Sequence, residues 1–169
     1  MSFFRSNIET PLGNLTAIAD EKKLWLLQFS DQVNLEHDIK MICEHPLTTK
    51  KSAPLVSIEQ ELQAYFAGKL KTWKTPFQLN GSTFQLQAWQ GLCAVPFGQT
   101  ISYAKQAENI GRKRAYRAVG SANGKNLLII IVPCHRIIAS DGGLGGFGAG
   151  LERKKWLLAH EEKITRASH

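Results

Sequence analysis

Residues 126–138 read NLLIIIVPCHRII. In this stretch an apolar run leads to a proline, and three residues with reactive or charged side chains follow the proline. The run from Leu127 to Val132 is the longest apolar stretch of the chain, and its six residues are far too few to span a membrane. A short apolar run bounded by proline predicts a buried strand that ends at Pro133. The segment therefore places Cys134 and His135 at the end of a strand, as a candidate reactive centre.

A reactive cysteine needs thiolate character, which a nearby base or cation supplies. Neighbouring strand residues face opposite sides, so His135 assists Cys134 only if the backbone bends at Pro133 or a water molecule carries the proton. A carboxylate would then orient the imidazole and stabilise its charged form. The carboxylates of the C-terminal half are Glu108, Asp141, Glu152, Glu161 and Glu162. On these residues alone, a buried and inert cysteine is an equally good interpretation.

The three cysteines of the chain lie far apart, and no CxxC pair occurs. This spacing predicts neither a disulfide framework nor a metal site, and no cofactor is expected. Cys43 and Cys93 are interpreted as structural residues. The N-terminus, MSFFRSNIET, lacks the basic start and the apolar stretch of a secretory signal. We therefore expect a cytoplasmic protein with reduced thiols.

The net charge of +7 is confined to one half of the chain. Residues 1–78 carry nine basic and nine acidic side chains, whereas residues 79–169 carry twelve basic and five acidic ones. Lysine, threonine, proline and glycine gather in residues 69–81, which predicts a boundary between an N-terminal domain, 1–78, and a C-terminal domain, 79–169. The basic excess favours a polyanion-binding module, although a basic surface kept for solubility also fits.

The two halves differ in their predicted elements. In the first half we expect strands at 14–20 and 24–30 and helices at 33–43 and 54–67. In the second half we expect helices at 82–93, from 102 to the break at Gly111, at 113–122 and at 151–160. Two short helices joined by a glycine-containing turn are typical of a helix-turn-helix.

The second helix of this motif lies in the sequence RKRAYRAVGSA, residues 112–122. Tyr116 and Val119 are expected to face the core. The neighbouring face combines small side chains with two nearby arginines, and its members are Ala115, Ala118, Ser121, Ala122, Arg114 and Arg117. Small side chains suit close approach to a narrow DNA groove better than bidentate reading of base edges. Tight helix–helix packing also explains them, but arginines are rarely buried without a partner.

Residues 142–150 contain six glycines and include the spacing Gly143-x-Gly145-x-x-Gly148. This spacing formally matches the dinucleotide-binding fingerprint, but no βαβ unit is expected around it. We interpret the segment as one wall of a substrate pocket, with a flexible surface loop as the alternative. The predicted pocket consists of Val132, Pro133, Leu144, Gly145, Phe147 and Gly148.

Together these motifs resemble those of the O6-alkylguanine-DNA alkyltransferases, also called methylated-DNA–protein-cysteine methyltransferases. PCHR is the signature of that family, so the resemblance implies that Cys134 accepts the alkyl group and that His135 is its base, acting through water. Other residues match at the family's spacing. The resemblance implies that Tyr103 in the SY motif assists departure of the guanine and that Arg117 in RAVG replaces the extruded base in the stack. It also implies that Asn126 supports the site and that Glu161 in WLLAHE orients the histidine.

The resemblance is close over residues 80–169 and covers 1–78 only by its strand-then-helix pattern. It implies an α+β protein of the α/β class, with a ribonuclease H-like N-terminal domain of sheet and helix and a mostly helical, winged-helix C-terminal domain that carries the active site. Leu127 stands where the family usually has proline, and Phe147 where many members have tyrosine. No cysteine precedes Cys43, so the zinc ligands of some animal members have no counterpart here and no metal is expected.

The implied activity is irreversible transfer of a methyl or larger alkyl group to Cys134 from O6-alkylguanine in double-stranded DNA, and O4-alkylthymine is left open as a second substrate. The base must leave the duplex toward the minor groove, because its target carbon is inaccessible in the stack. The protein is expected to be a monomer without a membrane partner, and cooperativity along DNA is left open. Two alternatives are a non-catalytic sensor of alkylated guanine, which would lack the cysteine, and a cysteine hydrolase, which leaves the basic helix-turn-helix unexplained.

Overall fold

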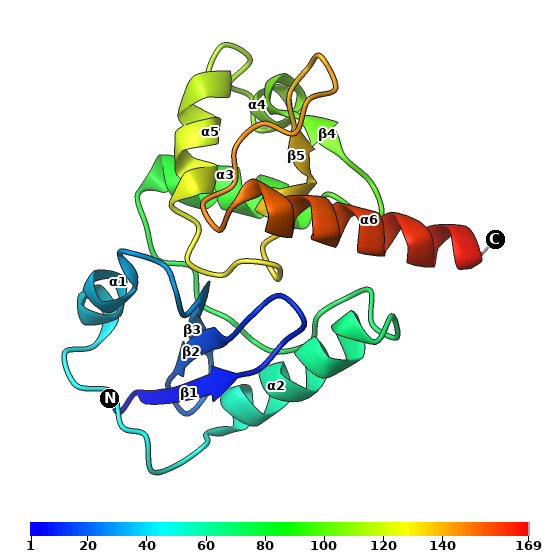
Figure 1. Cartoon of the computed structure of the whole chain (residues 1–169). Coiled ribbons are helices and arrows are strands. Elements are labelled where there is room, and N and C mark those ends of the chain that lie inside the picture. Colours follow the sequence, from blue (N-terminus) through cyan, green and yellow to red (C-terminus); the bar gives the residue numbers. More distant parts are fainter. Residues whose placement is uncertain (169) are drawn as a thin grey trace. The chain divides into compact units, whose positions relative to one another are not determined.

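The computed structural model describes residues 1–168, and its chain divides into two compact units. The first unit is Met1–Asn80, and the second unit begins at Gly81. Each unit has its own sheet and its own helices, so the chain has the mixed α/β composition that the sequence predicts (Figure 1). No helix within residues 1–168 is both long enough and apolar enough to cross a lipid bilayer.

The first unit is a three-stranded antiparallel sheet with two helices. Its elements are β1 (Phe4–Ile8), β2 (Leu15–Ala19), β3 (Leu24–Phe29), α1 (Leu35–Ile42) and α2 (Ala53–Phe66). All five residues of the central strand β2 are buried, and Leu15 pairs with Ile8 on one side and Phe29 on the other. Both predicted strands and both predicted helices are present, and β1 is an additional strand. Its alternating burial is that of a half-exposed edge strand, whose polar alternate residues give a weak apolar signal.

The second unit is mostly helical. Its elements are α3 (Thr83–Cys93), β4 (Ile101–Ser102), α4 (Tyr103–Asn109), α5 (Tyr116–Gly124), the 3-10 turn η1 (Cys134–Arg136), β5 (Ile137–Ile138) and α6 (Leu151–Ala167). Ser82 caps α3 in a capping box with Gln85, as its N-cap chemistry predicts. A small core of buried Ala88, Ala107, Val119 and Ala122 joins α3, α4 and α5. Small side chains allow these three short helices to pack closely.

A two-residue parallel pairing brings together parts of the second unit that are distant in sequence. Ile101 of β4 pairs with Ile137 of β5, and Ser102 pairs with Ile138. Because α4 begins at Tyr103 and η1 ends at Arg136, this pairing sets the start of α4 beside the PCHR segment (Figure 1). Two segments that contain candidate site residues are therefore joined by backbone hydrogen bonds.

The apolar run 127–132 is not the strand that its composition predicts. The chain turns back on itself there, with hydrogen bonds from Val132 N to the Leu128 carbonyl (2.9 Å) and from Ile131 N to the Ile129 carbonyl (2.8 Å). Ile130 has φ +72°, a left-handed conformation that is unusual for a β-branched residue. Residues 128–132 are buried, so the apolar composition correctly indicated burial. It could not indicate extension, because buried loops and buried strands share this composition.

Two glycines of the second unit allow a matched test of its packing. Gly98 (φ +80°) and Gly111 (φ +75°) both adopt left-handed backbone conformations. A Cβ on Gly98 would overlap the Thr165 hydroxyl of α6, whereas a Cβ on Gly111 would meet nothing within 4 Å. We predict that Gly111→Ala lowers the free energy of unfolding by about 1 kcal/mol through backbone strain. Gly98→Ala should cost about 1–3 kcal/mol more, because overpacking is added.

Urea denaturation of the two variants measures this difference. Equal losses of stability would show that α6 does not pack against the turn at Gly98.

Candidate active site

Cys134 is the first residue of η1 and is buried, with 7% of its surface exposed. The backbone does bend before it, because Pro133 has φ −83° and ψ 65° and Cys134 N bonds to the Val132 carbonyl at 2.8 Å. Its Sγ accepts a hydrogen bond from Asn126 Nδ2 at 3.3 Å. Burial raises the pKa of the Cys134 thiol, while the Asn126 amide and the positive charge of Lys154 act in the opposite direction. The resting thiol is therefore protonated and needs a base to become a nucleophile.

His135 and Glu161 form a buried pair next to the cysteine. His135 Nε2 lies 2.8 Å from Glu161 Oε2, and both side chains are at most 1% exposed. Burial alone would raise the pKa of Glu161, but the hydrogen bonds and charges of His135 and Arg136 outweigh it and hold this pKa well below the ordinary range. Glu161 is therefore a carboxylate, which only accepts, so the shared hydrogen belongs to His135 Nε2.

The other ring nitrogen of His135 is then unprotonated and basic. Burial lowers the pKa of His135 more than the Glu161 carboxylate raises it, so the imidazole is neutral at rest. Its Nδ1 atom is buried and has no hydrogen-bond partner within residues 1–168. A buried nitrogen lone pair without a partner is unusual in folded proteins. Here it is an available proton acceptor one residue from Cys134.

Arg136 is a third member of this cluster, and residue-by-residue reasoning from the sequence did not single it out. Its guanidinium contacts both oxygens of Glu161, through Nε at 2.8 Å and Nη2 at 3.1 Å, and Nη1 donates to the Val95 carbonyl at 2.8 Å. Gly98 N lies 3.3 Å from Glu161 Oε1. The sequence did contain a signal for this role, because Arg136 stands between His135 and two isoleucines. An arginine in such an apolar segment is rarely buried without a partner, so a buried carboxylate could have been expected beside it.

Tyr103 and the glycine-rich segment contact each other, and both line a small cavity. Gly146 N donates to the Tyr103 hydroxyl at 3.1 Å, and this hydroxyl lies 3.4 Å from the Gly146 carbonyl. A Cβ on Gly145 would lie 2.7 Å from the Tyr103 hydroxyl, so only glycine allows this approach. Burial and the neighbouring Cys134 raise the pKa of Tyr103, so its hydroxyl keeps the proton and can donate it.

The cavity measures about 110 Å³, and its lining consists of Tyr103, Gly120, Asn123, Gly124, Cys134, Gly146, Phe147 and Gly148. Its size fits a small ring system and is below the range of about 300 Å³ and more that larger ligands occupy. Of the predicted pocket residues, Phe147 and Gly148 line it, and Gly145 supports Tyr103 from outside the lining. Val132 and Pro133 are buried next to Cys134, and Leu144 lies outside the lining.

Lys154 of α6 is a further buried residue that the sequence did not single out. It has no exposed surface, and its Nζ donates to the carbonyls of Ile137 (2.6 Å) and Gly146 (3.0 Å). The same ammonium group lies 5.9 Å from the centre of the Tyr103 ring. Burial lowers the pKa of Lys154 to about 8, despite an opposing contribution from Cys134. Lys154 thus joins the glycine-rich segment to β5 and supplies positive charge near the cysteine.

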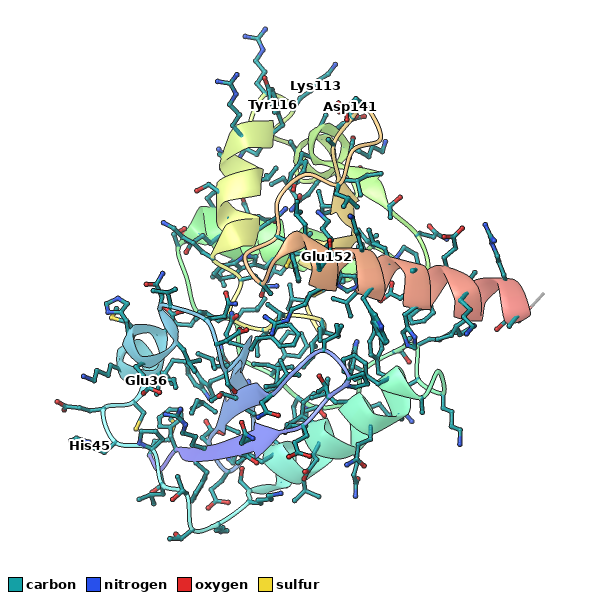
Figure 2. The ribbon with its side chains drawn as sticks, viewed as in Figure 1. Glu36, His45, Lys113, Tyr116, Asp141 and Glu152 are labelled. Carbon is teal, nitrogen blue, oxygen red and sulfur yellow. The ribbon has the colours of Figure 1, made fainter. Side chains whose placement is uncertain are left out.

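The basic end of α5 is exposed. Arg114, Arg117, Ala118 and Ser121 lie at the surface, and Arg117 lies over the ring of Tyr116 at 5.8 Å. Figure 2 shows Lys113 and Tyr116 projecting from this end of the helix. The structure does not place Ala122 on the same face, because it belongs to the helix core and its carbonyl accepts from Trp89 Nε1 at 2.8 Å.

Tyr116 also differs from its sequence prediction, because it is 47% exposed and does not face the core. Tyr116 is the first residue of α5, and the first buried residue of this helix is Val119, one turn later. Among residues 1–168, no group of three or more His, Cys, Asp or Glu side chains is arranged to hold a metal ion.

Glu161 and its neighbour Glu162 give a matched test of the buried cluster. Glu161→Gln leaves the buried Arg136 without its counter-ion and should lower the free energy of unfolding by about 3–5 kcal/mol at pH 7. Glu162 pairs with Arg166 at the surface, so Glu162→Gln should change it by less than about 1 kcal/mol. Because the folded pKa of Glu161 is lowered, its contribution is present above about pH 4.3 and is lost as the pH falls toward the folded pKa.

Urea denaturation at pH 7 and between pH 3 and 5 measures both effects. The Glu161→Gln variant should lose the part of the acid-dependent slope that Glu161 contributes, while the part due to other carboxylates with lowered pKa values, such as Asp20, remains. Equal stability of the two variants at pH 7 would contradict the buried cluster.

Lys154 and Lys155 give a second matched pair. Lys154→Met removes the buried charge that favours the Cys134 thiolate, so labelling of Cys134 by iodoacetamide at pH 7, below the pKa of Lys154, should slow. The rate should fall by roughly tenfold for each unit by which the pKa of Cys134 rises. Lys155→Met removes an exposed charge that pairs with Glu152, and the labelling rate should stay unchanged. Mass spectrometry of the Cys134 peptide measures the rates, and equal rates at pH 7 in the two variants would contradict the proposed effect of Lys154.

Comparison with known proteins gives the same result for both units. The ribonuclease-like domain of the 6-O-methylguanine DNA methyltransferases matches residues 4–79, and their DNA-binding domain matches residues 83–163. A methylated-DNA–protein-cysteine methyltransferase of Methanosarcina barkeri is 39% identical over 160 residues, which cover 94% of this chain and 97% of that protein. One of Mycolicibacterium paratuberculosis is 40% identical over 161 residues, which cover 95% and 93%.

Solved structures agree with the sequence comparisons. The O6-methylguanine methyltransferase of Mycobacterium tuberculosis superposes with a TM-score of 0.85 at 35% identity, over 96% of this chain and 94% of that one. A structure of Mycobacterium tuberculosis OGT in complex with DNA gives a TM-score of 0.85 at 35% identity, over 97% and 94%. With both domain models matched and relatives about 40% identical along nearly its whole length, this chain belongs to the 6-O-methylguanine DNA methyltransferase family.

Proposed function

We propose that this chain repairs alkylated DNA by direct reversal, moving a methyl or larger alkyl group from O6-alkylguanine onto Cys134 irreversibly. The observation that carries the proposal is the position of Cys134 in the lining of a cavity of about 110 Å³, next in the chain to a neutral, buried histidine. Family membership supports the same activity. It disfavours a cysteine hydrolase, and Cys134 is the acceptor that a non-catalytic sensor would lack.

The proposed reaction begins with loss of the thiol proton. His135 Nδ1 takes this proton from Cys134 through a water molecule, and Glu161 stabilises the resulting imidazolium. The thiolate attacks the saturated carbon on guanine O6, an S–C bond forms, and the C–O bond breaks with its electrons going to the purine. Tyr103 donates a proton to the departing purine and recovers one from the imidazolium. The net change is exchange of the thiol hydrogen for the alkyl group.

The product of this reaction explains single turnover. A thioether is stable to hydrolysis, and the side chains lining the cavity offer no nucleophile that would cleave it. Asn126, which bonds to Cys134 Sγ and to the Val132 carbonyl, holds the acceptor in place. Each molecule therefore repairs one lesion, and the transfer itself needs no cofactor.

DNA binding is assigned to the C-terminal domain, residues 79–169, and to the exposed face of α5. Arg114, Arg117, Ala118 and Ser121 would lie against the minor groove, and Arg117 would fill the space that the extruded base leaves. The N-terminal α/β domain, residues 1–78, is assigned no role in this proposal. The chain would act as a monomer on double-stranded DNA, in a compartment such as the cytoplasm that keeps thiols reduced.

Incubation with a duplex oligonucleotide that contains O6-methylguanine tests the function directly. We predict one methyl group on the Cys134 peptide and no more than one per protein molecule, as measured by mass spectrometry. Cys134→Ser should bind the same DNA, with an affinity that falls as salt increases, and should leave the lesion intact. Repeated turnover, or methylation of Cys43 or Cys93 alone, would rule out the mechanism.

A further inference from the structure

Tyr116 is an aromatic residue that the fold of the second unit leaves exposed. Among residues 1–168 it is the only aromatic member of the exposed large hydrophobic side chains, with 47% of its surface exposed. It is the first residue of α5, and Figure 2 shows its side chain projecting from this end of the helix. It does not belong to the core that Val119 and Ala122 form with α3 and α4. A tyrosine buries a large apolar area wherever a fold covers it, so packing gives no reason for an aromatic residue at this position.

Tyr116 stands within a dense group of basic side chains. Four of the six residues 112–117 are basic and exposed, and they are Arg112, Lys113, Arg114 and Arg117. Within residues 1–168 none of these four forms an ion pair with a carboxylate. Glu108, the carboxylate that precedes them in the chain, lies 3.7 Å from Lys105. The positive charge of the group is therefore available to DNA phosphates, and Arg117 has no carboxylate to hold its guanidinium.

The ring of Tyr116 contacts Arg117 where a counter-ion would otherwise be expected. Arg117 Cζ lies 5.8 Å from the centre of this ring, within the distance of about 6 Å over which an aromatic face attracts a cation. Neighbouring residues of a helix point about 100° apart, so these two side chains meet only because both are long and both lie at an exposed helix end. A second ring, that of Phe84, lies 5.9 Å from Arg112 Cζ. Each ring thus lies beside a different arginine.

We propose that Tyr116 is a positioning residue for Arg117, whose guanidinium its ring holds beside the exposed end of α5 before DNA binds. This inference rests on the proposed function, in which Arg117 fills the space that the extruded base leaves. Ordering a long side chain on binding costs conformational entropy. A contact that orders Arg117 in advance removes part of that cost from the step in which the base leaves the stack. Tyr116 itself touches no reacting atom and moves no proton.

The experiment measures the rate of methyl transfer to Cys134 from a duplex oligonucleotide that contains O6-methylguanine, under single-turnover conditions. Tyr116→Leu keeps an apolar side chain but removes the ring, and we expect it to lower the rate by roughly twofold to fivefold, the effect of one exposed cation–π contact. Tyr116→Phe keeps the ring and should keep the rate, because the Tyr116 hydroxyl forms no hydrogen bond within residues 1–168. Phe84→Leu removes the ring beside Arg112 and is the matched control, whose rate should stay unchanged.

A double-mutant cycle separates positioning from a structural role of the ring. Arg117→Ala alone should slow transfer, and adding Tyr116→Leu to it should cause no further loss if Tyr116 acts through Arg117. A general weakening of α5 would slow transfer by the same factor with and without Arg117, and that result would overturn the proposal. An unchanged rate in Tyr116→Leu would overturn it as well. Urea denaturation reports whether each variant is folded, and Tyr116→Ala replaces the leucine variant if that one does not fold.

The proposed function and this inference fail in different ways. If the unmodified protein transfers no methyl group to Cys134, the proposed function is wrong and this inference falls with it. If transfer occurs but Arg117→Ala does not slow it, the role assigned to Arg117 is wrong, and Tyr116 has nothing to position. If Arg117→Ala slows transfer and Tyr116→Leu causes the same loss in both backgrounds, only the assignment of Tyr116 is wrong.

Discussion

The hydrogen bonds of one amide, that of Asn126, hold the segment on which the candidate site depends. Asn126 Oδ1 accepts from Leu128 N at 2.9 Å, and Nδ2 donates to the Val132 carbonyl at 2.8 Å and to Cys134 Sγ at 3.3 Å. These bonds pair backbone groups at both ends of the buried turn, where water cannot reach them. They also balance the left-handed backbone of Ile130, which costs on the order of 1–3 kcal/mol. The bond to Sγ also restrains the side chain of Cys134 relative to this turn.

Two separate charge arrangements surround that cysteine. Arg136 and Glu161 form a buried bidentate pair, and Glu161 holds His135 through a hydrogen bond. Burial, together with the positive charge of Arg136, lowers the pKa of His135, so the imidazole remains neutral. Lys154 donates to the Gly146 carbonyl in the glycine-rich segment, and its positive charge favours the Cys134 thiolate. His135 is therefore oriented by the Arg136–Glu161 pair, while the charge of Lys154 favours the Cys134 thiolate. Both cations also lower the pKa of His135.

Backbone groups provide part of the cavity, which explains the glycines. Gly145 allows the close approach of Tyr103, and Gly146 bonds to the tyrosine hydroxyl through its N–H. Phe147 lies in the lining without a hydroxyl of its own. Leu127, which replaces the proline usual in the family, begins a turn that Asn126 closes by the same three hydrogen bonds. Neither departure removes a contact on which the proposed chemistry depends.

The sequence by itself determined the helix caps, the helix-turn-helix, the uneven charge and the pairing of a cysteine with a histidine after a proline, because each depends on residues near one another in the chain. It also indicated burial of the apolar run, which the structure shows for residues 128–132. Only the tertiary structure decided that this run turns back, since that conformation requires the side chain of Asn126 to pair backbone groups of residues 128 and 132. Likewise, Arg136 beside Glu161, Lys154 beside Gly146 and Gln106 beside Asn123 each join separate elements of the second unit. Local patterns contain no record of such contacts, because packing between elements creates them.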